Sequence, residues 1–230
     1  AAGTFVRWGY YVTYDRTSWT TLQAQLGNLD IVSPYFFQLR ADGTIEELND
    51  PAADTFLRQS GYTVLPMIKN IPRWDELTPL LADPQRRAAV IGRIVELVER
   101  RGYSGIHIDF EAVNASDAAH LTTFMQELAA QLHARGKLVT QAVVARTSDT
   151  PTNWGGAYDY AALGAVNDYI VIMAYDFHYA GGSPGPVAPL SWVRRVVDYA
   201  TTRIPASKLI LGVPLYGYDW DTTDGPPARS

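Results

Sequence analysis

The sequence contains no cysteine. This absence excludes disulfides, thiolate metal sites and a cysteine nucleophile. Charge is also scarce: 19% of the 230 residues are charged, and the formal net charge is −5. An acidic chain without basic runs disfavours nucleic acid as a partner, because phosphate binding usually requires a basic face. No apolar run approaches the roughly 18 residues of a membrane-spanning helix, and we expect no membrane partner.

Aromatic residues, in contrast, are common, with 14 Tyr and 6 Trp. Aromatic faces stack on sugar rings, but they also fill ordinary cores, so this count favours carbohydrate binding only weakly. The first residues lead directly into a predicted strand and show no signal-peptide pattern, as expected at the start of a mature chain. That observation says little about export.

Short apolar runs alternate with longer helical patterns along the chain. An Asp-Gly pair at 42–43 predicts a small β-excursion after the second strand. Asp83 before Pro84 predicts the start of a long amphipathic helix, and Gly102 predicts its end. The predicted strands are residues 5–12, 30–39, 63–69, 105–111, 137–145, 169–175 and 209–216, and the predicted helices are residues 18–26, 84–101, 116–135, 158–163 and 191–203.

Strands and helices that alternate at a spacing of roughly 30 residues are typical of parallel βαβ units. Seven such strands fit an α/β fold of the (β/α)8 TIM-barrel type better than a doubly wound sheet. No glycine-rich dinucleotide fingerprint or P-loop follows the first strand. We therefore expect a barrel that lacks its eighth strand in this chain. Residues 1–220 are assigned to one catalytic domain, and residues 221–230 to a flexible tail or a truncation point.

The strand at 105–111 (GIHIDFE) carries the most informative polar residues. In a barrel, the chemistry lies at the carboxyl ends of the strands. Because side chains alternate between faces, His107, Asp109 and Glu111 share one face and are predicted to point into the barrel. Neighbours on that face lie about 7 Å apart. Two carboxylates this close cannot both ionise freely, so one is expected to have a raised pKa, as a general acid requires.

The same alternation would arise in an edge strand whose polar face simply contacts water. Amphipathic helical patterns on both sides of the strand indicate instead that its outer face is covered. The polar face is therefore more consistent with a functional site.

Residues 102–111 (GYSGIHIDFE) resemble the strand-four signature DGxxDxDxE of glycoside hydrolase family 18, the chitinase-like family. Three further matches follow the family's order: residues 173–176 (MAYD), residues 212–217 (GVPLYG) and the aromatic Phe36. Within the family, residues 157–160 and 204–220 are most similar to bacterial spore cortex-lytic N-acetylglucosaminidases. Those relatives act on peptidoglycan and often carry separate wall-binding repeats, which this chain lacks.

The resemblance implies a retaining glycosidase that cleaves β-1,4 linkages at N-acetylglucosamine, with the substrate's own 2-acetamido group as the nucleophile. Glu111 is then the acid and base, Asp109 accepts a hydrogen bond from the acetamide N–H, and Tyr175 donates to the acetamide oxygen. No metal or cofactor is implied. The expected partner is a polysaccharide that contains N-acetylglucosamine, in a secreted, cell-wall or spore-associated setting. The implied sugar-contacting residues are Asp176, Tyr10, Phe36, Gln141, Met173 and His107; for Tyr10 and Phe36, packing inside the barrel is an equally good interpretation.

The sequence departs from the family pattern at His107, where many members have the first inner aspartate, and at Ser104. A histidine could still donate a hydrogen bond to Asp109. Two alternatives to a glycosidase remain: a chitinase-like carbohydrate-binding protein or inactive fragment on the same scaffold, and a barrel enzyme without sugar specificity. The presence of both Asp109 and Glu111 favours catalysis. The sequence leaves open whether the glycan is chitin or peptidoglycan.

Overall fold

The structure is a computed structural model that describes residues 5–150, 152 and 154–220, so the predicted tail at 221–230 lies outside the described residues. Seven parallel strands form a curled sheet in the order β1-β2-β5-β6-β7-β8-β9. Within the described residues no pairing joins β1 to β9, and the barrel is therefore open between them. The strands are β1 (Trp8–Val12), β2 (Ile31–Leu39), β5 (Met67–Asn70), β6 (Gly105–Asp109), β7 (Leu138–Val144), β8 (Tyr169–Met173) and β9 (Leu209–Leu211).

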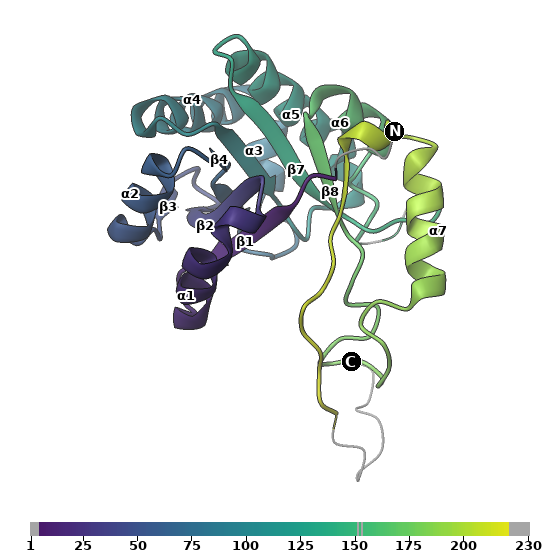
Figure 1. Cartoon of the computed structure of the whole chain (residues 1–230). Helices are drawn as coiled ribbons and strands as arrows, with labels where there is room; N and C mark the ends of the chain where they lie inside the picture. The colour runs from purple at the N-terminus through teal and green to yellow at the C-terminus, as the bar shows by residue number, and fades with distance from the viewer. Residues whose placement is uncertain (1–4, 151, 153, 221–230) are drawn as a thin grey trace.

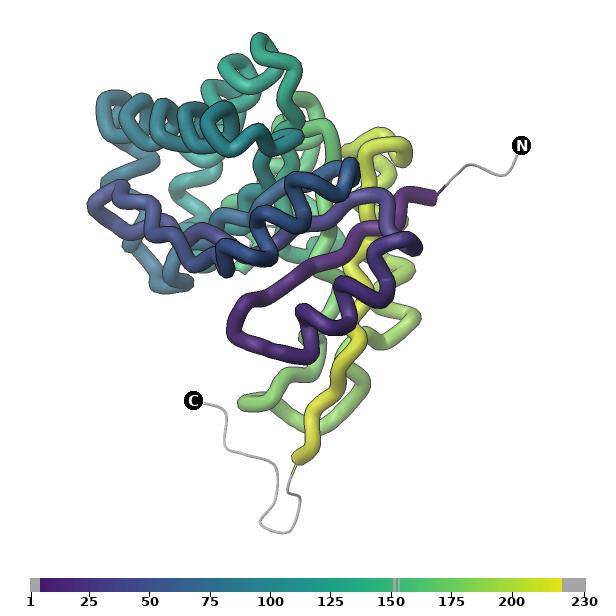
Figure 2. The backbone as a smooth tube through the Cα atoms, turned by 60° about the vertical axis from the view of Figure 1, so that its left-hand side comes forward, coloured from purple at the N-terminus to yellow at the C-terminus, as the bar shows by residue number. Residues whose placement is uncertain are grey.

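Helices cover the outer face of this sheet, and Figure 1 shows α4, α5 and α6 side by side on it. The segment after β9 runs away from the sheet beside the loop that follows β8, as both views show (Figures 1 and 2). No helix in the described part of the chain has the length and apolar character needed to cross a membrane. The helices are α1 (Arg16–Gln25), α2 (Pro51–Gln59), α3 (Thr78–Ala82), α4 (Pro84–Arg101), α5 (Ala118–His133), α6 (Tyr160–Val166) and α7 (Leu190–Thr201), with short 3-10 turns at Leu26–Asn28, Ala115–Asp117 and Ala206–Lys208.

The predicted ends of α4 are confirmed. The side chain of Asp83 accepts hydrogen bonds from the backbone N–H groups of Gln85 and Arg86, which otherwise have no partner in the first turn. Gly102 ends the helix with φ 72°, a left-handed conformation that favours glycine. The Asp42-Gly43 prediction is also confirmed, because β3 (Ile45–Glu47) returns antiparallel to β2.

Several other predicted boundaries were wrong. The strand predicted at 63–69 is split into β4 (Thr63–Val64) and β5, with Pro66 between them. Ser116 was expected to cap the next helix, but it lies in a 3-10 turn, and α5 begins at Ala118 with Asp117 at the cap position. The last strand ends at Leu211 rather than at residue 216. The helix α2 was not predicted, although Asp50 before Pro51 repeats the Asp-Pro signal that starts α4.

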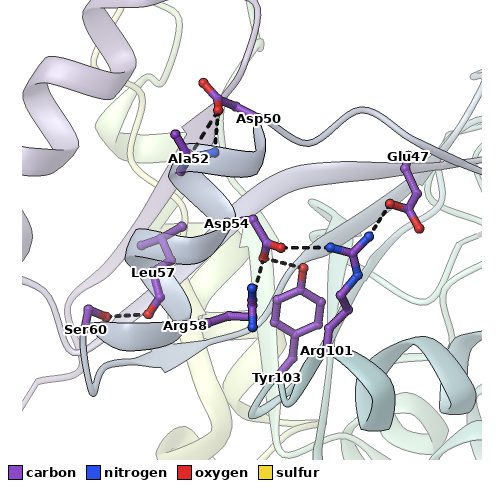
Figure 3. A network of polar contacts seen from close by, with 10 residues as sticks. Glu47, Asp50, Ala52, Asp54, Leu57, Arg58, Ser60, Arg101 and Tyr103 are labelled. Atoms are coloured by element: carbon purple, nitrogen blue, oxygen red, sulfur yellow. Dashed lines mark hydrogen bonds and ion pairs between the residues drawn. The ribbon is translucent and has the colours of Figure 1, made fainter.

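A buried aspartate ties α2 to the carboxyl end of α4 (Figure 3). Asp54 is only 1% exposed, and its carboxylate accepts hydrogen bonds from the Tyr103 hydroxyl at 2.7 Å and from Arg101 at 3.0 Å. Arg58, one turn along α2, approaches the same carboxylate at 3.3 Å. Arg101 also pairs with Glu47 of β3. This network fixes the segment that precedes β6, the strand on which the predicted site lies.

Candidate active site

Strand β6 has the predicted alternation. Ile106 and Ile108 are fully buried on the side that faces the helices, whereas His107 and Asp109 point into the curled sheet. Adjacent strands place their own inward side chains beside them, because residues paired in a parallel register share a face. Lys69 of β5 is paired with Asp109, and Thr140 of β7 is paired with His107.

Lys69 connects the two predicted carboxylates. Its Nζ lies 3.1 Å from Asp109 Oδ2 and 2.7 Å from Glu111 Oε1. Burial lowers the pKa of this ammonium, but the two carboxylates outweigh burial and raise it above its usual range. Lys69 was not predicted from the sequence, although a lysine at the carboxyl end of an apolar strand is itself a signal of a polar site.

The backbone around Glu111 is held by groups from two other elements. Asn70, at the end of β5, accepts from the Glu111 N–H at 2.8 Å and donates to the Glu111 carbonyl at 2.9 Å. The hydroxyl of Tyr158 donates to the Phe110 carbonyl at 2.6 Å. Because these bonds fix the main chain at Phe110 and Glu111, they fix the point at the mouth of the sheet from which the Glu111 side chain extends.

The sequence predicted that one carboxyl of the pair has a raised pKa, as a general acid requires; the raised pKa falls on Asp109, which is not the proposed acid. Burial is the main cause, since it disfavours the charged form. The ammonium of Lys69 opposes the shift, and the nearby Glu111 carboxylate adds to it. Asp109 is 5% exposed, and its Oδ1 has no hydrogen-bond partner within the described part of the chain. A buried acceptor without a partner is costly, so Oδ1 is suited to a donor from a ligand.

The sequence allowed a hydrogen bond from His107 to Asp109, but both ring nitrogens of His107 have other partners. Its Nδ1 lies 2.9 Å from the Thr140 hydroxyl, and its Nε2 lies 3.0 Å from the Tyr10 hydroxyl. The Thr140 hydroxyl donates to the Ile106 carbonyl at 3.2 Å, so it accepts from Nδ1–H, and Nε2 accepts from Tyr10. Burial, and then the charge of Lys69, lower the pKa of His107 to about 3. His107 is therefore neutral, and both of its ring nitrogens already have hydrogen-bond partners.

The other predicted residues on strand β8 and the loop after it lie at the same mouth. Met173 ends β8 on the inward face, since it is paired with Val144, four residues after inward-facing Thr140. Burial raises the pKa of Tyr175 to about 12, and the charges of Asp109 and Glu111 add to the shift.

Asp176 adopts a left-handed backbone, with φ 57°. Its Oδ1 accepts from the hydroxyls of Tyr216 and Tyr218 at 2.7 and 2.9 Å. A sugar hydroxyl that donates to Asp176 would therefore compete with two tyrosine hydroxyls that already donate to its carboxylate. This sharing makes Asp176 a weaker candidate for a sugar contact than Asp109.

The structure does not bring Phe36 or Gln141 to the site. Gln141 is paired with Ile108 and faces the helices, where its Oε1 lies 3.4 Å from the Asn167 amide at the end of α6. Phe36 is fully buried and packs edge-on against Tyr11, on the helix side of β1. Tyr35 is paired with Met67, which is paired with inward-facing His107, so the alternation of side chains turns Phe36 to the helix side. Both predicted sugar contacts are therefore corrected to core positions.

The described residues contain no cluster of three or more His, Asp or Glu side chains that could hold a metal ion. Within that part of the chain, the site is an acid pair, one ammonium and flanking phenols. Such a set can donate and accept protons and can stabilise a positive charge next to Asp109.

Comparisons with known proteins identify the family and the fold. Residues 6–229 match the family model described as glycosyl hydrolases family 18. The putative sporulation-specific glycosylase YdhD of Bacillus subtilis is 41% identical over 82% of this chain and 46% of its own length. The cortical fragment-lytic enzyme of B. subtilis is 33% identical over 88% of this chain and 49% of its own length. The chain thus spans about half the length of these curated relatives.

Solved structures confirm the barrel type. The chitinase of Chromobacterium violaceum superimposes with a TM-score of 0.86 at 29% identity, over 94% of this chain and 70% of that one. The spore cortex-lytic enzyme SleL of Bacillus cereus superimposes with a TM-score of 0.87 at 27% identity, over 99% of this chain and 56% of that one. From the family match across the described barrel, we conclude that this chain belongs to glycosyl hydrolase family 18.

Proposed function

We propose that the chain forms the catalytic barrel of a retaining glycosidase that cleaves β-1,4 linkages at N-acetylglucosamine. The observation that carries this proposal is the pair of carboxylates joined by Lys69, with Asp109 buried at the end of β6 and Glu111 two residues beyond it at the mouth. Retaining enzymes with a protein nucleophile place two carboxyl groups on opposite sides of the sugar, about 5 Å apart. Two acids that are two residues apart and contact the same ammonium suit a reaction in which the substrate supplies its own nucleophile.

In the proposed reaction, the acetamide carbonyl oxygen attacks the anomeric carbon while Glu111 protonates the leaving glycosidic oxygen. The glycosidic bond breaks, and a cyclic oxazolinium intermediate forms. Water then adds at the anomeric carbon and loses a proton to Glu111, which restores the acetamide. Asp109 Oδ1, which lacks a partner in the described residues, would accept from the acetamide N–H and stabilise the positive charge. Tyr175 would donate to the acetamide oxygen.

The proposed substrate is a bacterial cell-wall glycan rather than chitin. Two relatives that match this chain over most of its length are named for sporulation and for lysis of cortical fragments. The chitinases among the similar structures keep chitin as the second candidate. By the same reasoning, the protein would act outside the cytoplasm, at the wall or the spore, with any wall-binding repeats elsewhere in the protein.

Replacing Glu111 by Gln tests the proposal. The variant keeps the shape of the side chain but removes the proton donor, so hydrolysis of muropeptide-derived glycan and of chitin oligomers should fall by at least about 100-fold. Glu96→Gln, on the exposed face of α4, is the matched control and should hydrolyse as the native protein does. Near-native hydrolysis by Glu111→Gln would overturn the assignment. Oligosaccharide binding without hydrolysis by the native protein would favour the carbohydrate-binding alternative.

A further inference from the structure

Lys69 is the one strong cation in contact with the acid pair in the described site, and it is unexplained by the proposed roles of Asp109 and Glu111. Its side chain is 28% exposed, so it is neither a free surface lysine nor a core residue. Both of its carboxylate contacts lie within hydrogen-bond distance, at 3.1 and 2.7 Å. Ordering this side chain and removing water from its charge both cost free energy. The two carboxylates offset this cost, so the position of Lys69 depends on the acid pair.

Asp109 has no acidic neighbour earlier on its own strand. The inward position before it is His107, which is neutral and has both ring nitrogens engaged by Tyr10 and Thr140. A proton therefore cannot be shared between Asp109 and this residue. Lys69, from the neighbouring strand, is the group that contacts Asp109 Oδ2 instead.

The other groups around Lys69 do not replace its charge. It contacts Asp109 at the end of β6 and Glu111 just beyond it, and its charge lowers the pKa of His107, which burial lowers most. Its charge also acts on two phenols, Tyr35 of β2 and Tyr175 of the loop after β8, where it opposes the rise in pKa that burial causes. Neither phenol is charged near neutral pH, because a phenol ordinarily titrates near pH 10 and burial raises the pKa of both further.

We propose that Lys69 is a positioning residue that keeps Asp109 ionised and oriented, in place of a second inner acid. This inference rests on the proposed glycosidase function. In the free protein, Lys69 holds both carboxylates at a fixed separation. When a sugar binds, Lys69 retains Asp109 Oδ2, Asp109 Oδ1 receives the acetamide donor, and Glu111 Oε1 leaves the ammonium to reach the glycosidic oxygen.

Replacing Lys69 by Met keeps the apolar stem and removes the charge. Lys69 lowers the pKa of Asp109, so its removal raises that pKa further. An opposite charge within about 4–6 Å commonly shifts a carboxyl by 1–3 pH units. Because catalysis needs ionised Asp109, the acid limb of the profile of kcat/KM against pH should move to higher pH by at least about one unit. The loss at acidic pH should fall mainly on kcat, since the charge next to the acetamide matters most in the transition state.

The test measures Asp109 directly, without substrate. The 13C signal of its carboxyl is assigned by its loss in Asp109→Asn and titrated in the native protein, Lys69→Met, Lys69→Gln and Lys69→Arg. The two neutral variants should titrate Asp109 at higher pH than the native protein, and Lys69→Arg should restore most of the native midpoint. Lys137→Met removes the same charge far from the site, where Lys137 Nζ donates to the Tyr103 carbonyl, and should leave the midpoint unchanged.

Two outcomes separate the two proposals. An unchanged Asp109 midpoint in a folded Lys69→Met or Lys69→Gln, with an unshifted acid limb, would overturn the role of Lys69 while leaving the glycosidase assignment intact. If the Asp109 midpoint shifts in the Lys69 variants but the native protein hydrolyses no glycan, the electrostatic role of Lys69 is supported and the proposed function is overturned.

Discussion

The buried histidine in the site should make the protein sensitive to acid in a measurable way. His107 has a pKa of about 3 in the folded chain, whereas an unfolded histidine titrates near 6.5. For a group whose folded pKa is depressed, stability is fully present above the unfolded pKa and is lost as the pH falls towards the folded value. The relevant window therefore runs from about pH 6.5 down to about pH 3.

The size of the effect follows from the same two values. Between pH 7 and pH 4.5 the unfolded chain gains nearly one proton at this histidine and the folded chain gains almost none. Each pH unit below 6.5 then costs about 1.4 kcal/mol, which gives a loss of about 2.5 kcal/mol at pH 4.5. That loss is a large fraction of the roughly 5–15 kcal/mol by which domains are stable.

The assay is urea unfolding at both pH values, for the native protein and for His107→Gln. Glutamine can still accept from the Tyr10 hydroxyl but cannot take up a proton. Loss of the Nδ1–Thr140 bond should lower its stability at pH 7 by about 1 kcal/mol. Between pH 7 and pH 4.5, the free energy of unfolding of His107→Gln should fall by about 2.5 kcal/mol less than that of the native protein. Equal losses in the two proteins would refute the assignment of His107 as a neutral buried residue.

Two further predictions concern the scaffold around β6. Asp54→Asn should lower the free energy of unfolding by about 2–3 kcal/mol, measured in urea, because it breaks a buried pair and leaves Arg101 and Arg58 partly uncompensated; a change below about 0.5 kcal/mol would contradict this. Gly105→Ala should be strongly destabilising, since its Cβ would lie 2.0 Å from the Leu138 carbonyl oxygen, whereas Gly92→Ala, which meets nothing within 4 Å in α4, should stabilise by about 0.5–1 kcal/mol; equal thermal midpoints for the two would contradict the tight β6–β7 contact.

The barrel and the carboxylate strand could be predicted because both depend on local pattern. The two-residue period of β6 alone separates Ile106 and Ile108 from His107 and Asp109. The βα rhythm predicts parallel strands, and the helix cap at Asp83 is a short-range signal.

The errors lie where register between strands decides the outcome. Gln141 follows Thr140 directly, and only the pairing of β7 with β6 shows which of the two points inward. For Phe36 and its neighbour Tyr35, likewise, only the pairing of β2 with β5 shows which of the two points inward. Lys69 was missed because its carboxylate partners lie about 40 residues further along the chain, as the separation of Lys69 and Glu111 shows.

The most direct test of the proposed reaction is the configuration of the sugar when it is first released. Proton NMR, recorded within the first minutes of hydrolysis of a β-1,4-linked N-acetylglucosamine oligomer, distinguishes the two anomers before they interconvert. Retention through the acetamide route predicts that the β-anomer appears first and that an oligomer without the acetyl group at the cleavage position is not cut. Initial release of the α-anomer, or equal cleavage of the deacetylated oligomer, would contradict the proposed roles of Asp109 and Glu111.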